Sequence, residues 1–191
     1  MSIRPRAFAI LFALGAVLFT LLDSIHVHTH TLAYAHPFVF GSAWWVPLLM
    51  GCATSFGGVA YVLAWSRAGG PPRLASGVAL GAALVLTAVM YAASGLMPVS
   101  SMTKLVVLTL GAAVIFFLVD GTRTGAVLML AGAVCGPIAE AINPGFDHLA
   151  PDFMRVPMWL PALYACVTPA IGQLARKLVG SPRRSRQWYS S

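Results

Sequence analysis

The residues best suited to chemistry gather in one short segment, DSIHVHTH, which carries Asp23 and the histidines His26, His28 and His30. On a helix, His26 and His30 would share one face four residues apart, which is the spacing of a two-histidine zinc site. The segment has no HExxH glutamate, and no second carboxylate or cysteine lies at a fitting offset. It therefore favours an interfacial loop whose imidazoles face water or head groups. A metal site, and with it a membrane enzyme, is the alternative.

The remaining acidic residues lie at the edges of the apolar segments. Asp120, Asp147 and Asp152 fall at segment ends or between segments, and Glu140 comes close to the end of its own. An ionisable group at the bilayer centre costs about 2.5 kcal/mol or more, and such groups mark ion paths or catalytic sites. Their scarcity argues against a proton-coupled pump or an intramembrane protease. We expect no catalytic residue, no metal and no cofactor, and a site for something apolar.

The elements that position these residues are predicted to lie in a membrane. Of the 191 residues, 59% are hydrophobic and 9% are charged, whereas a soluble domain keeps about 25% charged residues. Crossing the hydrocarbon core takes about 20 apolar residues in a helix, and the apolar segments do not alternate as the strands of a membrane barrel do. The sequence predicts an all-α polytopic membrane protein. Its cysteines lie inside apolar segments without disulfide or metal spacing.

Six transmembrane helices are predicted within one domain, residues 1–191, which ends in a basic tail at 179–191. The expected spans are 6–22, 44–65, 74–97, 103–119, 124–142 and 156–178. Of the 12 Lys and Arg residues, all except Lys104 and Arg155 fall at the termini or in the second and fourth connections. Basic segments are retained on the cytoplasmic side, so both termini are predicted to be cytoplasmic. The net charge of +7 then needs no nucleic acid to explain it.

Small and aromatic residues predict how the helices pack and where they meet the interface. Glycines recur four residues apart at Gly77 and Gly81, and again at Gly132 and Gly136, a spacing that allows close helix contact in lipid. Such faces make a homo-oligomer, a trimer or a dimer, plausible. Tryptophans near span ends are typical of the interfacial belt, and the predicted anchors are Trp44, Trp45 and Trp159.

Three separated motifs stand out along the chain. Residues 40–51 read FGSAWWVPLLMG and residues 120–125 read DGTRTG. PDF at 151–153 is followed by WLP at 159–161 and then by Gly172, Arg176 and Leu178. In this order the motifs resemble those of the Insig (insulin-induced gene) family of animal endoplasmic-reticulum proteins. The resemblance covers residues 40–178 and agrees with the count of six spans.

The resemblance implies a non-enzymatic protein that binds an oxysterol within its bundle and retains sterol-sensing membrane proteins, Scap and HMG-CoA reductase. Asp120 matches an aspartate tied to partner binding, with Arg123 beside it. Thr103 and Phe116 stand where the family's sterol pocket has a glutamine and a tryptophan. Threonine keeps a hydroxyl without the reach of an amide, and phenylalanine lacks the indole N–H. The pocket is expected to persist with altered sterol specificity. Arg155 is also displaced from the family position, which Pro157 occupies here.

We therefore expect an Insig-like protein that holds an amphiphilic lipid, diacylglycerol-like or sterol-like, in a central cavity. Regulation of a membrane partner is a further expectation, but a bacterial cell has no Scap. As an alternative role, Asp120 would cap the fifth helix, and such a cap stabilises a protein by about 1 kcal/mol. The runner-up function is a small transporter or channel. The arginine-rich, alanine-rich composition favours a bacterial plasma membrane; for a eukaryotic chain the expected location is the endoplasmic reticulum. The predicted lipid-binding residues are Thr103, Phe116, Thr87, Met90, Ser94, Val107 and Gln173.

Overall fold

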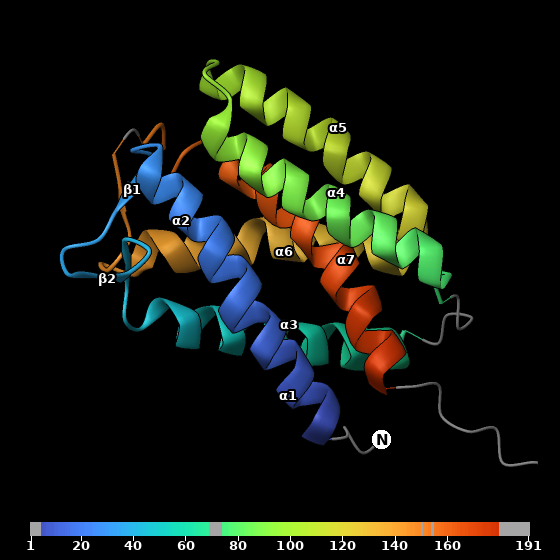
Figure 1. Ribbon diagram of the computed structural model, residues 1–191. Coiled ribbons are helices and arrows are strands. Elements are labelled where there is room, and N and C mark those ends of the chain that lie inside the picture. Colours follow the sequence, from blue (N-terminus) through green and yellow to red (C-terminus); the bar gives the residue numbers. More distant parts are fainter. Residues whose placement is uncertain (1–4, 69–73, 150, 154, 180–191) are drawn as a thin grey trace, which may run out of the picture.

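The protein is a bundle of helices, seen here in a computed structural model that describes residues 5–68, 74–149, 151–153 and 155–179 (Figure 1). The predicted basic tail beyond residue 179 lies outside the described residues. The mostly helical fold class is confirmed. In chain order the helical elements are α1 (Pro5–Leu14), η1 (Gly15–Phe19), α2 (Thr20–His28), α3 (Val46–Arg67), α4 (Gly77–Leu96), α5 (Ser101–Val119), α6 (Arg123–Ile142) and α7 (Leu160–Val179).

The first three helical elements follow one another without a break and form a single apolar segment, Pro5–His28. Its middle, η1, is a π-helix, a form that occurs mostly as a single turn within α-helices, frequently at functional sites. The prediction that this helix ends at Leu22 is wrong, because it continues through Asp23 and His26. Both side chains are buried with hydrogen-bond partners, so polarity does not end the helix here.

Five helical segments among the described residues are long and apolar enough to cross a membrane: Pro5–His28, Val46–Arg67, Gly77–Leu96, Ser101–Val119 and Arg123–Ile142. The sixth predicted span corresponds to α7, which carries Gln173, Arg176 and Lys177. α7 packs against α3, α4, α5 and α6 and so lies at the centre of the bundle. Its polar residues are therefore compatible with a helix shielded from lipid. That α7 itself spans the bilayer remains a prediction.

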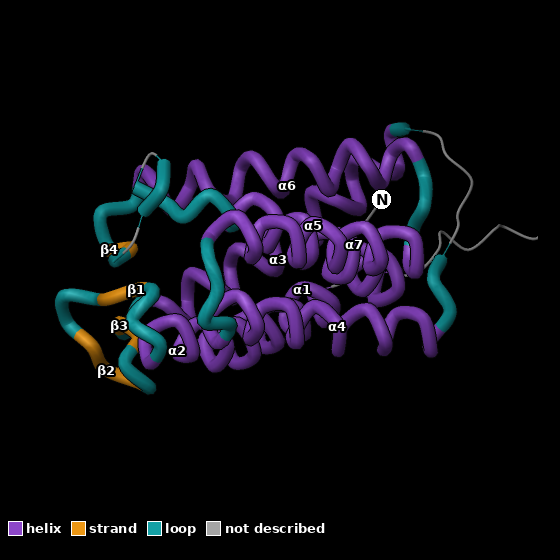
Figure 2. The backbone as a smooth tube through the Cα atoms, turned by 90° about the horizontal axis from the view of Figure 1, so that it is seen from above, coloured by secondary structure: helices purple, strands orange, loops and turns teal. Residues whose placement is uncertain are grey.

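Short strands close one end of the bundle (Figure 2). β1 (Leu32–Ala33) pairs antiparallel with β4 (Asp147–His148), which ties the connection after α2 to the connection after α6. β2 (Pro37–Val39) and β3 (Ser42–Ala43) form a hairpin. We call this end of the bundle the strand end. The sequence analysis predicted none of these pairs.

The two described termini lie together at the opposite end. Ala7 and Leu11 of α1 share one buried cluster with Val62 of α3 and with Ala175 and Val179 of α7. An even number of crossings would produce this arrangement. It agrees with termini on one side of a membrane, while the cytoplasmic assignment stays a prediction.

The two predicted glycine pairs behave differently. Gly132 and Gly136 of α6 lie so close to Thr168 and Tyr164 of α7 that an added Cβ would clash with both side chains. This pair packs helices together, as predicted. Gly81 makes no such contact within this chain, because an added Cβ there would meet nothing within 4 Å.

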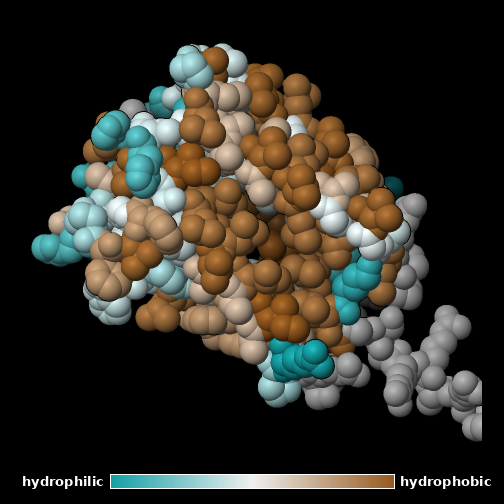
Figure 3. All heavy atoms as spheres, viewed as in Figure 1, coloured by the Kyte–Doolittle hydropathy of each residue, from teal (hydrophilic) through white to brown (hydrophobic). Residues whose placement is uncertain are grey.

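The outer surface of the helices suits a hydrocarbon solvent. Figure 3 shows hydrophobic residues over most of the face formed by the helices, and hydrophilic residues mainly near the strand end with a smaller group at the opposite end. Large apolar side chains point outward from the long helices, among them Val78, Val85, Leu110, Phe117 and Val127. In water such a surface would aggregate, so it supports the membrane assignment.

Candidate functional site

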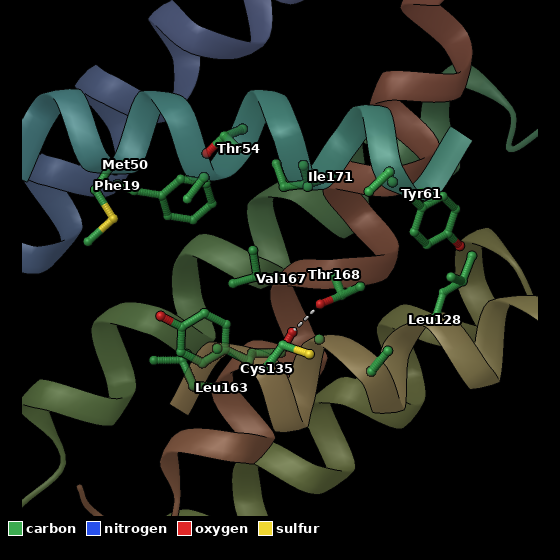
Figure 4. A pocket seen from close by; sticks show the side chains of 18 of the residues that line it. Phe19, Met50, Thr54, Tyr61, Leu128, Cys135, Leu163, Val167, Thr168 and Ile171 are labelled. Carbon is green, nitrogen blue, oxygen red and sulfur yellow. Dashed lines mark hydrogen bonds between the residues drawn. The ribbon is translucent and has the colours of Figure 1, made fainter. Parts of the chain in front are cut away.

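A cavity of about 510 Å³ lies between α3 and α6, with α7 and the end of η1 completing its walls (Figure 4). Figure 4 shows Met50 and Phe19 at one end and Tyr61 and Leu128 at the other. The volume falls within the range of about 300–1,000 Å³ typical of small-molecule pockets. The structure therefore contains a central cavity, as predicted, although its walls differ from those expected.

Small residues on α3 and α6 create this space. Ala53, Gly57, Ala60 and Ala64 of α3 recur at intervals of four, three and four and so share one helical face. α6 presents an equivalent face, with Ala131, Gly132, Cys135 and Gly136. Because these side chains are short and α3 and α6 contact each other only slightly, the gap between the two helices stays open. Ala53, Gly57, Ala60, Ala131 and Cys135 are exposed, so the cavity opens sideways, toward the lipid if these helices span the bilayer.

The cavity has a polar end, formed by Glu140 of α6. The Tyr164 hydroxyl donates to Glu140 Oε1, and His148 Nε2 lies 2.9 Å from Oε2. The side chains of His148 and Glu140 are only 5% and 12% exposed. β4 brings His148 into place by pairing with β1. A carboxylate with two donors is thus fixed where the apolar walls meet the strand end.

A smaller pocket, of about 10 Å³, adjoins the cavity at this polar end. Tyr91, Glu140 and Leu163 line both spaces. The other residues of the small pocket are Asp23, His26, Thr31, Leu32, His148, Trp159 and Leu160. A void of about this size holds roughly one water-sized group.

Asp23 is anchored between α2 and the strands. Its Oδ2 accepts from the Tyr34 hydroxyl at 2.9 Å and from the Ser42 hydroxyl at 3.0 Å. Burial, reinforced by the Asp23 carboxylate, raises the pKa of Tyr34 well above its ordinary value. Tyr34 therefore stays a hydrogen-bond donor at neutral pH. The carboxylate and the hairpin hold each other in place.

His26 faces the bundle rather than water. Its Nε2 lies 2.8 Å from Ser94 Oγ, and Ser94 donates its own proton to the Tyr91 carbonyl. The ring packs against Tyr91 and Trp159. The prediction of imidazoles facing water or head groups is therefore wrong for His26.

The other histidines of the segment separate from His26. α2 ends at His28, and His30 follows with a φ of 54°, so His26 and His30 share no helical face. His28 and His30 are exposed. Among the described residues no group of three or more His, Cys, Asp or Glu side chains is placed to hold a metal ion. The geometry assumed for the metal alternative is absent.

Asp120 closes the other end of the cavity through Tyr61. The Tyr61 hydroxyl, which belongs to a wall residue, donates to Asp120 Oδ2 at 2.7 Å, and Gln173 Nε2 donates to the same atom at 2.9 Å. Asp120 is 4% exposed. Thr122, which also donates to Asp120, caps α6 by accepting from the Gly125 N–H at 3.0 Å. The predicted cap thus comes from Thr122, with Asp120 holding that threonine.

The seven predicted lipid-binding residues are all described, and none of them lines the cavity. Thr103 is exposed and hydrogen-bonds to Ser100 at the start of α5, while Phe116 is buried beside Phe117. Gln173 and Ser94 instead support the networks at the two ends. Of the last three, Thr87 of α4 donates to the Cys166 carbonyl of α7 at 3.3 Å. Met90 of α4 lies close to Gly111 of α5, and Val107 belongs to α5.

The predicted partner and interface residues have distinct surroundings. Arg123 begins α6 beside the Asp120 turn. Trp44 is 64% exposed, as an interfacial anchor requires, whereas Trp159 is only 3% exposed and packs inside. Trp45 packs edge to face against Tyr34 and Phe146. Sequence reasoning missed the α3 face altogether, although its repeated small residues were a readable signal.

The fold and the cavity define a class, that of helical membrane proteins with a lateral apolar pocket. No protein-family model matches the chain. An INSIG protein homolog of Mycolicibacterium vanbaalenii is 35% identical over 200 residues, covering 95% of this chain and 94% of the relative. The insulin-induced gene 1 protein of Bos taurus is 25% identical over 187 residues, covering 92% of this chain and 67% of that protein. The chain belongs to the Insig family.

Solved structures share the fold. A cross-linked trimer of MvINS superposes with a TM-score of 0.83 at 24% identity, covering 94% of this chain and 97% of that chain. A structure of MvINS, described as a mycobacterial Insig homolog from Mycobacterium vanbaalenii, gives a TM-score of 0.81 at 24% identity. The match covers 92% of this chain and 95% of that chain.

Proposed function

We propose that this Insig-family membrane protein is a non-enzymatic lipid-binding protein, and that an amphiphilic lipid, diacylglycerol-like or sterol-like, occupies the cavity between α3 and α6. The observation that carries the proposal is the shape of the site. A cavity of about 510 Å³ has mostly apolar walls, a side opening and one carboxylate in its lining, that of Glu140, at one end. An amphiphile has the same asymmetry, an apolar body and one polar end.

Shape and head-group bonds must supply most of the selectivity. Burying an apolar chain from water gains about 0.8 kcal/mol per CH₂, but a ligand that leaves lipid tails has already made this gain. Thr168 and Tyr164 put hydroxyls on the α7 wall. The Tyr164 hydroxyl donates to Glu140, and the Thr168 hydroxyl donates to the Tyr164 carbonyl. The fixed polar end is therefore the feature that can tell one amphiphile from another.

A transporter or channel is less well supported. Such a protein needs a polar path with charged or carbonyl-lined sites at mid-membrane. Here the carboxylates of Glu140 and Asp120 lie near opposite ends, and the described residues between them on the cavity wall are apolar or carry only hydroxyls and a thiol. Flux through liposomes that contain the protein would favour this alternative.

We infer that the protein works as a homo-oligomer in a bacterial plasma membrane. The trimeric MvINS structure supports the first point, and the mycobacterial relative supports the second. Partner binding at Asp120 and Arg123 remains a proposal from the family resemblance. Because Asp120 is enclosed, a partner would contact the α5–α6 turn that Asp120 holds in place, and not the carboxylate itself.

A cavity-filling variant tests the proposal. Ala131→Trp places an indole in the cavity, and Val134→Trp puts the same indole on the outer face of α6, where Val134 is exposed. Lipids that copurify with each protein are extracted and identified by mass spectrometry. We expect Ala131→Trp to lose the bound amphiphile and Val134→Trp to keep it. Equal amounts of copurified lipid in both variants and in the parent protein would show that the lipid binds outside this cavity.

A further inference from the structure

We propose that the small pocket at Asp23, Glu140 and His148 binds the head group of the cavity's ligand, and that it selects an uncharged head group with a free hydroxyl over an anionic one. This inference rests on the proposed lipid-binding function and adds a specificity determinant, Glu140. The starting point is that the two spaces are neighbours, because Tyr91, Glu140 and Leu163 line both the large cavity and the small pocket. A ligand whose polar end reaches Glu140 in the cavity therefore lies next to the small pocket.

The size of the small pocket limits the head group. Its volume of about 10 Å³ corresponds to roughly one water-sized group. A hydroxyl fits such a space, whereas a phosphate with its several oxygens does not fit without displacement of the walls. Trp159 and Leu160 form the opposite wall, and Trp159 packs against His26. This wall is held by aromatic contacts rather than by flexible side chains.

Two carboxylates line the pocket, beside the hydroxyls of Thr31 and Tyr91. The Glu140 carboxylate receives bonds from Tyr164 and His148 and keeps further lone pairs. Asp23 accepts bonds from Tyr34 and Ser42 and also lines the pocket. These two carboxylates disfavour a negatively charged group in a site with little water. They favour a group that donates a hydrogen bond.

One buried acceptor also lacks a partner. His148 lines the pocket, its Nε2 bonds to Glu140, and its Nδ1 is buried without a hydrogen-bond partner among the described residues. In the neutral tautomer that donates from Nε2, Nδ1 is an acceptor. Buried polar atoms without partners are uncommon, and such an atom often marks a missing water or ligand. A head-group hydroxyl would donate to Nδ1 or to Glu140.

Two lipids with identical tails provide the test. Dioleoylglycerol carries a free hydroxyl, and dioleoyl phosphatidic acid replaces it with a phosphate. Each competes, on the full-length protein in detergent, against a photoreactive diacylglycerol that labels the cavity. We expect dioleoylglycerol to compete at least about tenfold better than phosphatidic acid, and Glu140→Gln to reduce that preference to within about threefold. Asp147→Asn, which removes an exposed carboxylate next to His148, is the matched control and should keep the parent's preference.

Several outcomes would overturn the proposal. Equal competition by the two lipids in the parent protein, or an unchanged preference in Glu140→Gln, removes Glu140 from head-group selection. A second variant, His148→Phe, lacks the Nδ1 acceptor and should weaken competition by dioleoylglycerol. Competition as strong as in the parent protein would show that Nδ1 does not bind the head-group hydroxyl. If the photoreactive lipid labels Ala131→Trp as well as the parent, the cavity assignment itself fails. The two failures are thus distinguishable.

Discussion

At the scale of single residues, Asp120 is enclosed by its donors. Tyr61, Gln173 and Thr122 join α3, α7 and the α5–α6 turn to one carboxylate. The family resemblance points to a partner-binding role, and the local geometry shows a structural one. The two roles are compatible, since a turn that a partner contacts must first be held in shape.

The Asp120→Asn variant tests the structural role. An amide keeps the size of the side chain and loses the charge-assisted bonds, so we expect a loss of about 1–3 kcal/mol in stability. SDS titration of the purified protein would measure it. Asp147→Asn removes an exposed carboxylate and should have almost no effect. Equal stability of Asp120→Asn and the parent protein would show that the network contributes little.

Thr103 separates the two candidate positions for the ligand. The resemblance assigns it to the pocket, but its side chain is exposed at the start of α5 and bonds to Ser100. The cavity between α3 and α6 lies elsewhere, so Thr103→Val should leave lipid content unchanged. Met50→Trp, at the end of the cavity near Phe19, should lower it. The opposite pattern in extracted lipid would favour the position implied by the resemblance.

At the scale of elements, hydropathy predicted six helices at nearly the right places. α5 and α6 begin and end within two residues of the predictions. It missed the last turns of the first helix, because the polar residues there find partners that only the folded bundle supplies. The short strands were also missed, since pairs such as Leu32 with His148 are set by contacts far apart in sequence.

The two glycine pairs make a matched test at this scale. Gly136→Ala adds a methyl group against Tyr164, and overpacking of this kind costs about 1–3 kcal/mol. Gly81→Ala adds one into open space and should be neutral or stabilising by up to about 1 kcal/mol. Thermal denaturation in detergent would compare the two. Similar melting temperatures would contradict close α6–α7 packing at Gly136.

At the scale of the whole molecule, the family and the helical membrane fold could be predicted from the sequence, but the site could not. The motifs lie in segments that the resemblance aligns, whereas the cavity depends on two small-residue faces meeting across the bundle. Periodicity identifies such a face on α3 without saying which helix it meets. The residues assigned by resemblance therefore pointed toward α5, and the open space lies beside α6.

Cys135 offers the most direct measurement of the central claim, because its side chain lines the cavity and is exposed. Delipidated protein is treated with a methanethiosulfonate reagent, with and without dioleoylglycerol, and peptide mass spectrometry measures labelling at each cysteine. We expect the lipid to protect Cys135 in a saturable manner. Labelling of Cys52, which lies outside the cavity lining, should not change. Labelling of Cys135 that the lipid does not alter would contradict a ligand in this cavity.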